Sequence, residues 1–139
     1  MKILIDTCVV LDVLQKREPF WESAYEVLSL VVKQKVQGRI AAKSVTDIYY
    51  HMRKAVQSRE TASAQLYDLL DIFLIEDTLA EDCRNALAKG YRDFEDGVLA
   101  ETAKRTKAAC IVTRNLKDFE DTDVQAVTPA DFLRLMKNA

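Results

Sequence analysis

The stretch MKILIDTCVVLDVL, residues 1–14, decides the fold of this chain. Its run Ile3-Leu4-Ile5 is short and apolar, as in a strand that a parallel sheet buries on both faces. Asp6 follows the run directly, and the apolar residues from Val9 to Leu14 predict that a helix comes next. A carboxylate at the end of a buried strand is costly to desolvate unless it is paired or bound to metal. The segment therefore predicts an α/β protein whose ligand site lies at the end of its first strand.

Short apolar runs and longer helical patterns alternate through the rest of the chain. Beyond residues 2–5, strands are expected at 39–42, 72–75, 110–113 and 124–127. Helices are expected at 19–37, 61–70 and 93–107, and three more are expected to begin near residues 44, 78 and 128. Pro19 suits the first turn of a helix, Gly38 a helix end, Ser44 an N-cap and Thr78 a capping box. This alternation is typical of βαβ units, so we expect a mainly parallel sheet with helices on both faces.

The size and composition of the chain indicate one globular domain, spanning residues 1–139. A chain of 139 residues buries a sufficient core without disulfides or a structural metal. Its 49% hydrophobic and 30% charged residues are ordinary for a globular protein and do not indicate a disordered one. No apolar run approaches the roughly 20 residues that cross a bilayer, and the chain opens on a strand rather than a secretory signal. We therefore expect a cytoplasmic protein that does not bind a membrane.

Several chemistries are excluded because the residues that would carry them are missing from the sequence. Cys8, Cys83 and Cys110 are widely spaced and lie outside any Cys-x-x-Cys or Cys/His pattern, so neither a disulfide framework nor a zinc site is expected. Cys8 and Cys110 lie among Val, Ile and Ala and are expected to be small buried apolar groups, and all three cysteines are expected to be structural. The lone His51 has no Ser/His/Asp arrangement around it, and the sequence contains no glycine-rich phosphate loop. A nucleotide cofactor is therefore not expected.

The net charge of -2 and the pI of about 5.5 do not by themselves indicate a nucleic-acid-binding protein. The basic residues, however, gather in two stretches, 33–59 and 104–117, on either side of a mainly acidic stretch. A distribution of this kind fits a negatively charged substrate that is held beside a metal site. For any single basic residue, an ordinary solvated helix face explains the charge equally well.

Four acids lie where strands end or helices begin: Asp6, Asp47, Asp96 and Asp118. The loops after the carboxyl ends of parallel strands form the ligand sites of α/β proteins. Carboxylates that gather there repel one another unless a cation lies between them, and a hard ion such as Mg²⁺ or Mn²⁺ suits their oxygen atoms. The four acids are therefore candidate residues of a metal site.

Helix capping is the competing explanation for these acids. Asp47 lies three residues after Ser44, a spacing that suits a capping interaction at least as well as a metal site. Asp93 is better placed than Asp96 to cap the helix that begins there, which frees Asp96 for a site. Capping explains neither Asp6 nor Asp96 well, so these two acids are the stronger candidates.

Four blocks of the sequence together resemble the PIN-domain family: residues 1–12, Ser44–Tyr50, Asp93–Gly97 and Ile111–Phe119. The resemblance implies a three-layer α/β/α sandwich with a mainly parallel five-stranded sheet. It also implies an endoribonuclease that depends on Mg²⁺ or Mn²⁺ and cleaves RNA. Most small prokaryotic members are VapC-like toxins of toxin–antitoxin pairs, so the resemblance further implies a homodimer and a cognate antitoxin as partner.

The resemblance also assigns a site, residue by residue. Asp6, Asp47 and Asp96 match the first three acids of the family, and the segment from Asn115 to Asp118 matches its fourth acidic region. It implies that Asp6, Asp96 and Asp118 are the metal-binding acids, with Asp6 and Asp96 holding the principal cation. Asp118, together with Asn115, would either bind this cation or position the attacking water, and Asp47 would complete the shell or a second metal site. Three bases are candidates for contacts with the substrate phosphate: Arg114, Lys43 and Lys117.

Two positions depart from the pattern of the family. Asp47 stands where the family more often has Glu, and its shorter side chain reaches less far. Asn115 stands where relatives often have Asp, which lowers the local negative charge. These departures leave open a catalytically weak module that binds RNA or protein without cutting. Phosphoryl transfer through an Asp6 nucleophile is disfavoured, because such enzymes place a second Asp where this chain has Cys8.

Overall fold

The computed structural model describes residues 1–138 of the chain. Within that range, five strands form one parallel sheet in the order β3-β2-β1-β4-β5, so β1 lies at its centre. The strands are β1 (Lys2–Ile5), β2 (Gln37–Ala41), β3 (Leu74–Glu76), β4 (Cys110–Val112) and β5 (Ala126–Val127). Because every paired strand runs in the same direction, all five carboxyl ends lie at one edge of the sheet.

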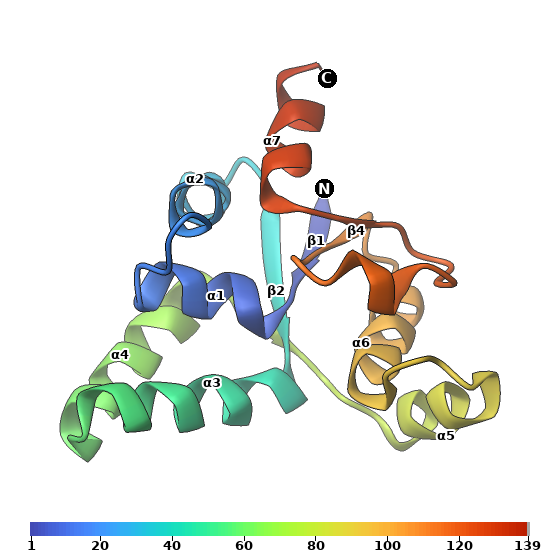
Figure 1. Cartoon of the computed structure of the whole chain (residues 1–139), viewed down its shortest axis with the longest axis horizontal. Coiled ribbons are helices and arrows are strands. Elements are labelled where there is room, and N and C mark those ends of the chain that lie inside the picture. Colours follow the sequence, from blue (N-terminus) through green and yellow to red (C-terminus); the bar gives the residue numbers. More distant parts are fainter. Residues whose placement is uncertain (139) are drawn as a thin grey trace.

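Helices cover both faces of this sheet (Figure 1). On one face lie α1 (Thr7–Leu14), α2 (Trp21–Val32), α3 (Ala42–Val56) and α4 (Arg59–Ile72), and on the other α5 (Ala80–Lys89) and α6 (Phe94–Arg105). The last helix, α7 (Pro129–Lys137), packs against α2, and a short 3₁₀ helix, η1 (Leu116–Phe119), follows β4. The predicted three-layer α/β/α sandwich with a parallel five-stranded sheet is therefore confirmed.

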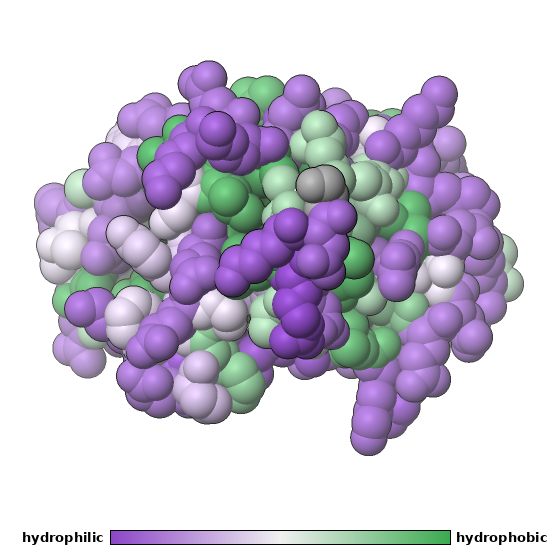
Figure 2. Space-filling view, turned by 90° about the horizontal axis from the view of Figure 1, so that it is seen from above, coloured by the Kyte–Doolittle hydropathy of each residue, from purple (hydrophilic) through white to green (hydrophobic). Residues whose placement is uncertain are grey.

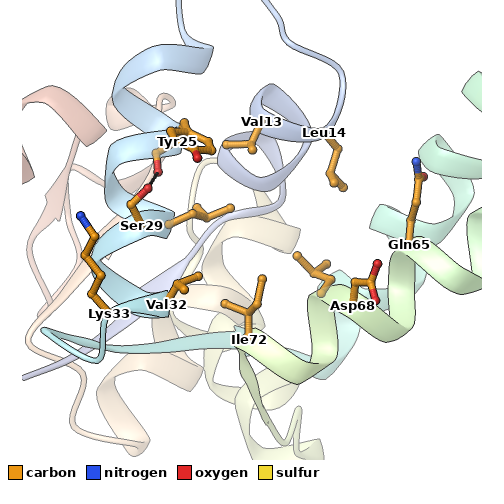
Figure 3. A pocket seen from close by; sticks show the side chains of 11 residues that line it. Val13, Leu14, Tyr25, Ser29, Val32, Lys33, Gln65, Asp68 and Ile72 are labelled. Atoms are coloured by element: carbon orange, nitrogen blue, oxygen red, sulfur yellow. Dashed lines mark hydrogen bonds between the residues drawn. The ribbon is translucent and has the colours of Figure 1, made fainter.

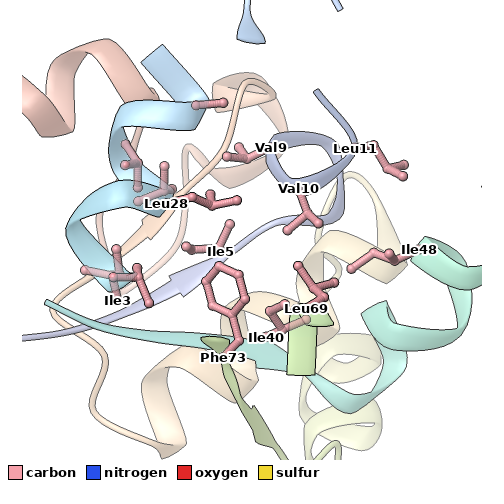
Figure 4. Packing of buried hydrophobic residues seen from close by; sticks show 14 of the residues in the cluster. Ile3, Ile5, Val9, Val10, Leu11, Leu28, Ile40, Ile48, Leu69 and Phe73 are labelled. Carbon is pink, nitrogen blue, oxygen red and sulfur yellow. The ribbon is translucent and has the colours of Figure 1, made fainter. Parts of the chain in front are cut away.

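The central strand β1 is buried on both faces because its successive side chains point to opposite sides of the sheet. Ile3 and Ile5 lie in the larger hydrophobic cluster, together with side chains of α1, α2, α3 and α4 (Figure 4). Leu4 points to the other face and belongs to a second cluster with Leu99 of α6 and Ile111 of β4. Packing on both sides fixes β1 in place, and with it the acid that follows.

The second helix and the second strand have other bounds than the sequence predicts. α2 ends at Val32 rather than near residue 37, and Pro19 precedes the helix instead of lying in its first turn. Gly38 lies inside β2 and does not end a helix. A Cβ atom at position 38 would come within 2.7 Å of Val31 and 2.8 Å of Phe73, so glycine serves close packing here and not a turn.

Two predicted N-caps are wrong. Ser44 lies inside α3, which follows β2 without a break and has Ala41 at its N-cap position. The Ser44 side chain is fully buried, and within residues 1–138 its hydroxyl has no hydrogen-bond partner. At the start of α5, the carboxylate of Asp82 accepts a hydrogen bond from the Leu79 amide at 2.9 Å, so Thr78 does not form the capping box. In both cases the helix begins at a different residue from the one that the local pattern suggests.

The three cysteines do not share one environment. Cys110 is buried as expected, but Cys83 is exposed on α5 and Cys8 is only partly buried. The prediction of a buried thiol is therefore confirmed for Cys110 but not for Cys8. Within the described part of the chain, no helix is both long enough and apolar enough to span a membrane.

Candidate active site

The carboxyl ends of the neighbouring strands β1 and β4 meet at Asp6. Asp6 directly follows β1 and is only 7% exposed. It also lies at the N-cap of α1, so the prediction that helix capping does not account for Asp6 is wrong. Its Oδ1 atom accepts a hydrogen bond from the backbone amide of Thr7 at 2.8 Å. Its Oδ2 atom accepts one from the hydroxyl of Thr113, which follows β4, at 2.7 Å. These bonds fix the orientation of the carboxylate at the edge of the sheet.

A pocket of about 330 Å³ opens over Asp6, and we refer to it as the acidic pocket. Asp47 of α3, Asp96 of α6 and Asn115 line it together with Asp6. Further lining residues come from α1, α3, α6 and the loops beside them: Thr7, Cys8, Leu11, Arg17, Lys43, His51 and Glu95. Because α3 begins at Ala42, Asp47 lies in its second turn and not at a cap position. The structure thus removes the capping explanation for Asp47.

Asp118 joins the site through its contact with Asp96. Carboxylate oxygen atoms of Asp93, Asp96 and Asp118 lie within 4.8 Å of one another, a spacing at which they could share a metal ion. Asp93 caps α6 as expected, accepting from the Asp96 amide at 3.0 Å, but its carboxylate also belongs to this cluster. The sequence does not indicate this second role of Asp93, because capping alone accounts for its position.

The pKa values of two acids show how crowded this site is. Burial raises the pKa of Asp6, and the hydrogen bond from Thr113 offsets part of that rise. Burial also raises the pKa of Asp96 to about 7, and the negative charges of Asp6, Asp93 and Asp118 add to the rise. A divalent cation at this position would favour the charged form of each carboxylate. The donor set consists of oxygen atoms, which fits a hard ion such as Mg²⁺ or Mn²⁺.

The raised pKa of Asp96 predicts that the metal-free protein loses stability as the pH rises. The unfolded chain releases this proton near the ordinary value of 3.8, whereas the folded protein holds it until about pH 7. Between these values the folded state binds more protons, so the free energy of unfolding falls as the pH increases. We expect the melting temperature in EDTA to fall by on the order of 5 °C across this range relative to an Asp96→Asn variant.

Thermal unfolding at a series of pH values measures this effect. Added Mg²⁺ or Mn²⁺ should raise the melting temperature of the wild type at neutral pH, because a ligand that binds only the folded state stabilises it. A wild-type curve that stays parallel to the Asp96→Asn curve over the whole pH range would contradict the prediction.

Two cations line the acidic pocket, and only one of them is predicted by the sequence. Lys43 lies at the start of α3, where the hydroxyl of Thr78 accepts from its backbone amide at 3.1 Å. Arg17, in the loop after α1, is the second cation. A lone arginine in a loop forms no recognisable pattern, so the sequence does not indicate it. Lys117 is exposed in a neighbouring pocket, which Asp118 also lines.

Arg114 is held by Asp12 and does not line the acidic pocket. Asp12, in α1, is fully buried. Arg114 donates to both of its carboxylate oxygens, from Nε at 2.6 Å and from Nη2 at 3.0 Å, and a nitrogen of Arg17 lies 3.9 Å away. Because a buried carboxylate must be paired, this contact anchors the loop that also carries Thr113 and Asn115.

A separate apolar groove of about 400 Å³ lies between α1, α2 and α4 (Figure 3). Val13 and Leu14 of α1, Tyr25 and Val32 of α2, and Ile72 of α4 line it. Tyr25 and Val32 are more than half exposed, at 55% and 59%. Viewed from the side of α7, hydrophobic residues also gather near the middle of the molecular surface (Figure 2). Exposed apolar side chains that line a groove are typical of a protein-binding surface.

The fold is shared with several solved toxin–antitoxin structures, although no curated protein sequence matches the chain significantly. VapBC2 from Rickettsia felis, bound to a DNA fragment from its promoter, has a TM-score of 0.71 and 21% identity, over 92% of this chain and 98% of that chain. VapBC-1 from nontypeable Haemophilus influenzae has a TM-score of 0.69 and 18% identity, over 94% of this chain and 99% of that chain.

VapC20 from Mycobacterium tuberculosis, described as a toxin that cleaves the sarcin–ricin loop, has a TM-score of 0.62 and 12% identity. That match covers 78% of this chain and 86% of that chain. At such identities the structural likeness shows a common fold alone. The sequence model of the PIN domain family, by contrast, matches residues 2–117, which include Asp6, Asp47, Asp96 and Asn115. This chain therefore belongs to the PIN domain family.

Proposed function

We propose that this protein is a metal-dependent endoribonuclease that cleaves phosphodiester bonds in RNA. The observation that carries the proposal is the carboxylate cluster around Asp96, where burial and neighbouring acids raise the pKa of that residue to about 7. Acids that crowd together at the carboxyl edge of a parallel sheet are stabilised when a divalent cation binds between them. Membership of the PIN domain family supports a nuclease activity, as does the description of the similar VapC20 structure as a cleaving toxin.

In this proposal, Asp96 and Asp118 hold a Mg²⁺ or Mn²⁺ ion together with Asp93 of the same cluster. Asp6 lines the acidic pocket with Asp96 and binds the ion from that side. When bound, the ion supplies Lewis-acid chemistry, which lowers the pKa of water and neutralises charge on the scissile phosphate. Asp47 lies in the same acidic pocket and accepts a hydrogen bond from the attacking water. Asn115 orients that water through its side-chain carbonyl without adding charge.

The two cations that line the acidic pocket bind the phosphate backbone of the substrate in this proposal. Lys43 supplies one positive charge and Arg17 another. The Arg17 guanidinium donates to Gln15 from Nε at 3.0 Å and from Nη2 at 2.7 Å. Its Nη1 atom lies 3.9 Å from Asp12, which leaves that nitrogen free to donate to a phosphate oxygen. Lys117, which lines the neighbouring pocket with Asp118, contacts a phosphate farther along the strand in this proposal.

Cleavage of an end-labelled single-stranded RNA by the purified protein tests this proposal. We expect cleavage in Mg²⁺ or Mn²⁺ and none in EDTA, with activity restored when the metal is returned. Binding of the RNA without any cleavage in either metal would favour the alternative, a catalytically weak binding module, over the nuclease.

We further propose that the protein is the toxin of a toxin–antitoxin pair and that a cognate antitoxin covers its apolar groove. Two kinds of observation support this partner: the similar structures are VapBC complexes, and the groove exposes Tyr25 and Val32. Growth arrest on expression of this protein alone, relieved by co-expression of a short neighbouring reading frame, is the expected result. Light scattering of the purified protein tests the proposed homodimer.

A further inference from the structure

A second pocket, of about 320 Å³, adjoins the acidic pocket, and we call it the Phe20 pocket. It is lined by residues from the start of α2, the loop after β4 and the start of α7: Phe20, Ser23, Arg114, Thr128, Pro129 and Ala130. Two short segments link it to the acidic pocket. Arg114 precedes Asn115 in sequence, and the Phe20 amide donates to the carbonyl of Arg17 at 2.9 Å. The two pockets therefore have neighbouring walls at the same edge of the sheet.

The wall of the Phe20 pocket contains a cation–π pair, which we refer to as the stack. The guanidinium of Arg114 lies over the ring of Phe20, 3.9 Å from its centroid. Phe20 is 39% exposed, although an aromatic ring of this size gains stability from full burial. Aromatic rings and guanidinium planes are the surfaces on which RNA-binding proteins stack unpaired bases.

Asp12 keeps this stack rigid. Its buried carboxylate receives two hydrogen bonds from Arg114, and it lies outside the carboxylate cluster of Asp93, Asp96 and Asp118. A guanidinium that is held by two hydrogen bonds has already lost its rotational freedom. Stacking of a base against it therefore costs little further side-chain conformational entropy. Asp12 is thus a positioning residue, which acts on a substrate through Arg114.

We propose that the Phe20 pocket binds one nucleobase of the RNA substrate, adjacent to the scissile phosphate. This inference rests on the proposed nuclease function and adds a subsite to it. The base stacks on the unit formed by Phe20 and Arg114. Ser23 and Thr128 line the same pocket. The Ser23 hydroxyl donates to the Phe20 carbonyl at 3.4 Å, and the Thr128 hydroxyl accepts from the Asp131 amide at 3.1 Å, so these contacts hold both side chains in the pocket wall. The volume of about 320 Å³ lies at the lower end of the range for small-ligand pockets, about 300–1,000 Å³.

Binding of RNA that lacks a single base tests the subsite. The probes are one short single-stranded RNA with a mapped cleavage site and a set of copies, each with one abasic ribose, measured by fluorescence anisotropy in EDTA. For the wild type, we expect one abasic position beside the cleavage site to weaken binding by roughly tenfold, the effect of one lost stacking contact. Abasic positions farther away should change the affinity little.

Two variants connect that position to Phe20. Phe20→Ala and Phe20→Leu should each weaken binding of the intact RNA, and in both the abasic substitution should cause no further loss. Phe20→Leu retains an apolar side chain against Arg114. We therefore expect it to fold like the wild type, so that weaker binding by this variant reports the loss of the aromatic ring. Tyr67→Ala, which removes a 75% exposed aromatic ring from α4, is the matched control and should bind like the wild type.

The possible failures are distinguishable. If the wild type cleaves RNA but no abasic position weakens its binding, the base subsite is wrong and the nuclease function stands. The same conclusion follows if the losses from the abasic position and from Phe20→Leu simply add. If the wild type neither binds nor cleaves RNA, both the subsite and the proposed function are overturned.

Discussion

Replacing Asp96 by Asn is expected to lower the metal-dependent rate of RNA cleavage by on the order of 10³-fold. Asp96 contacts both parts of the acidic site, since it lines the acidic pocket with Asp6 and shares the carboxylate cluster with Asp93 and Asp118. The amide retains the shape of the side chain but removes one negative charge and one carboxylate oxygen. The rate is measured in single-turnover reactions with saturating Mn²⁺.

The Asp96→Asn variant should fold as stably as the wild type. Its side chain is partly buried among other acids, so the loss of a negative charge relieves repulsion and should leave the melting temperature equal or higher. Asp71→Asn is the matched control, because it makes the same chemical change at an exposed position of α4. Wild-type cleavage by a well-folded Asp96→Asn protein would overturn the assignment of the active site.

Replacing Arg114 by Met is expected to destabilise the protein by about 3 kcal/mol, the lower end of the effect of breaking a buried ion pair. Methionine retains most of the side-chain stem but leaves the fully buried Asp12 carboxylate without its two hydrogen bonds. Arg17, at 3.9 Å, compensates only in part. Urea unfolding measures the loss, which corresponds to a fall in melting temperature of about 10 °C.

An exposed ion pair on the same molecule provides the control for this effect. Arg134 of α7 pairs with Asp131, and their side chains are 70% and 46% exposed. Arg134→Met should therefore cost less than about 1 kcal/mol, as surface pairs usually do. In the double variant Asp12→Leu/Arg114→Met, the buried charge at position 12 is removed together with its partner, and part of the stability should return. Equal effects of Arg114→Met and Arg134→Met would show that Asp12 is not the buried anchor inferred here.

The sequence predicts those parts of the site that depend on local order. An apolar run followed by an acid is enough to place Asp6, because a strand buried on both faces must end where its side chains become polar. The prediction that Asp93 caps α6 is confirmed, and Asp96 lies one turn farther on and lines the acidic pocket. Both arguments use only neighbouring residues and the known geometry of strand and helix ends.

The remaining parts depend on contacts between distant segments. Asp12 and Arg114 are 102 residues apart, so no local pattern shows that one neutralises the other. Ser44 resembles an N-cap, but the backbone becomes helical directly after β2, and tertiary packing overrides the capping preference. The same shift turns Asp47 from a presumed capping residue into a lining residue of the acidic pocket.

Binding of Mn²⁺ to the metal-free protein, followed by electron paramagnetic resonance without RNA, tests the central claim most directly. We expect the wild type to bind Mn²⁺, with Mg²⁺ competing for the same site. Asp96→Asn should weaken that binding by at least about tenfold, whereas Asp71→Asn should leave it unchanged. Equal Mn²⁺ affinities for the wild type and Asp96→Asn would contradict a metal site built on this carboxylate cluster.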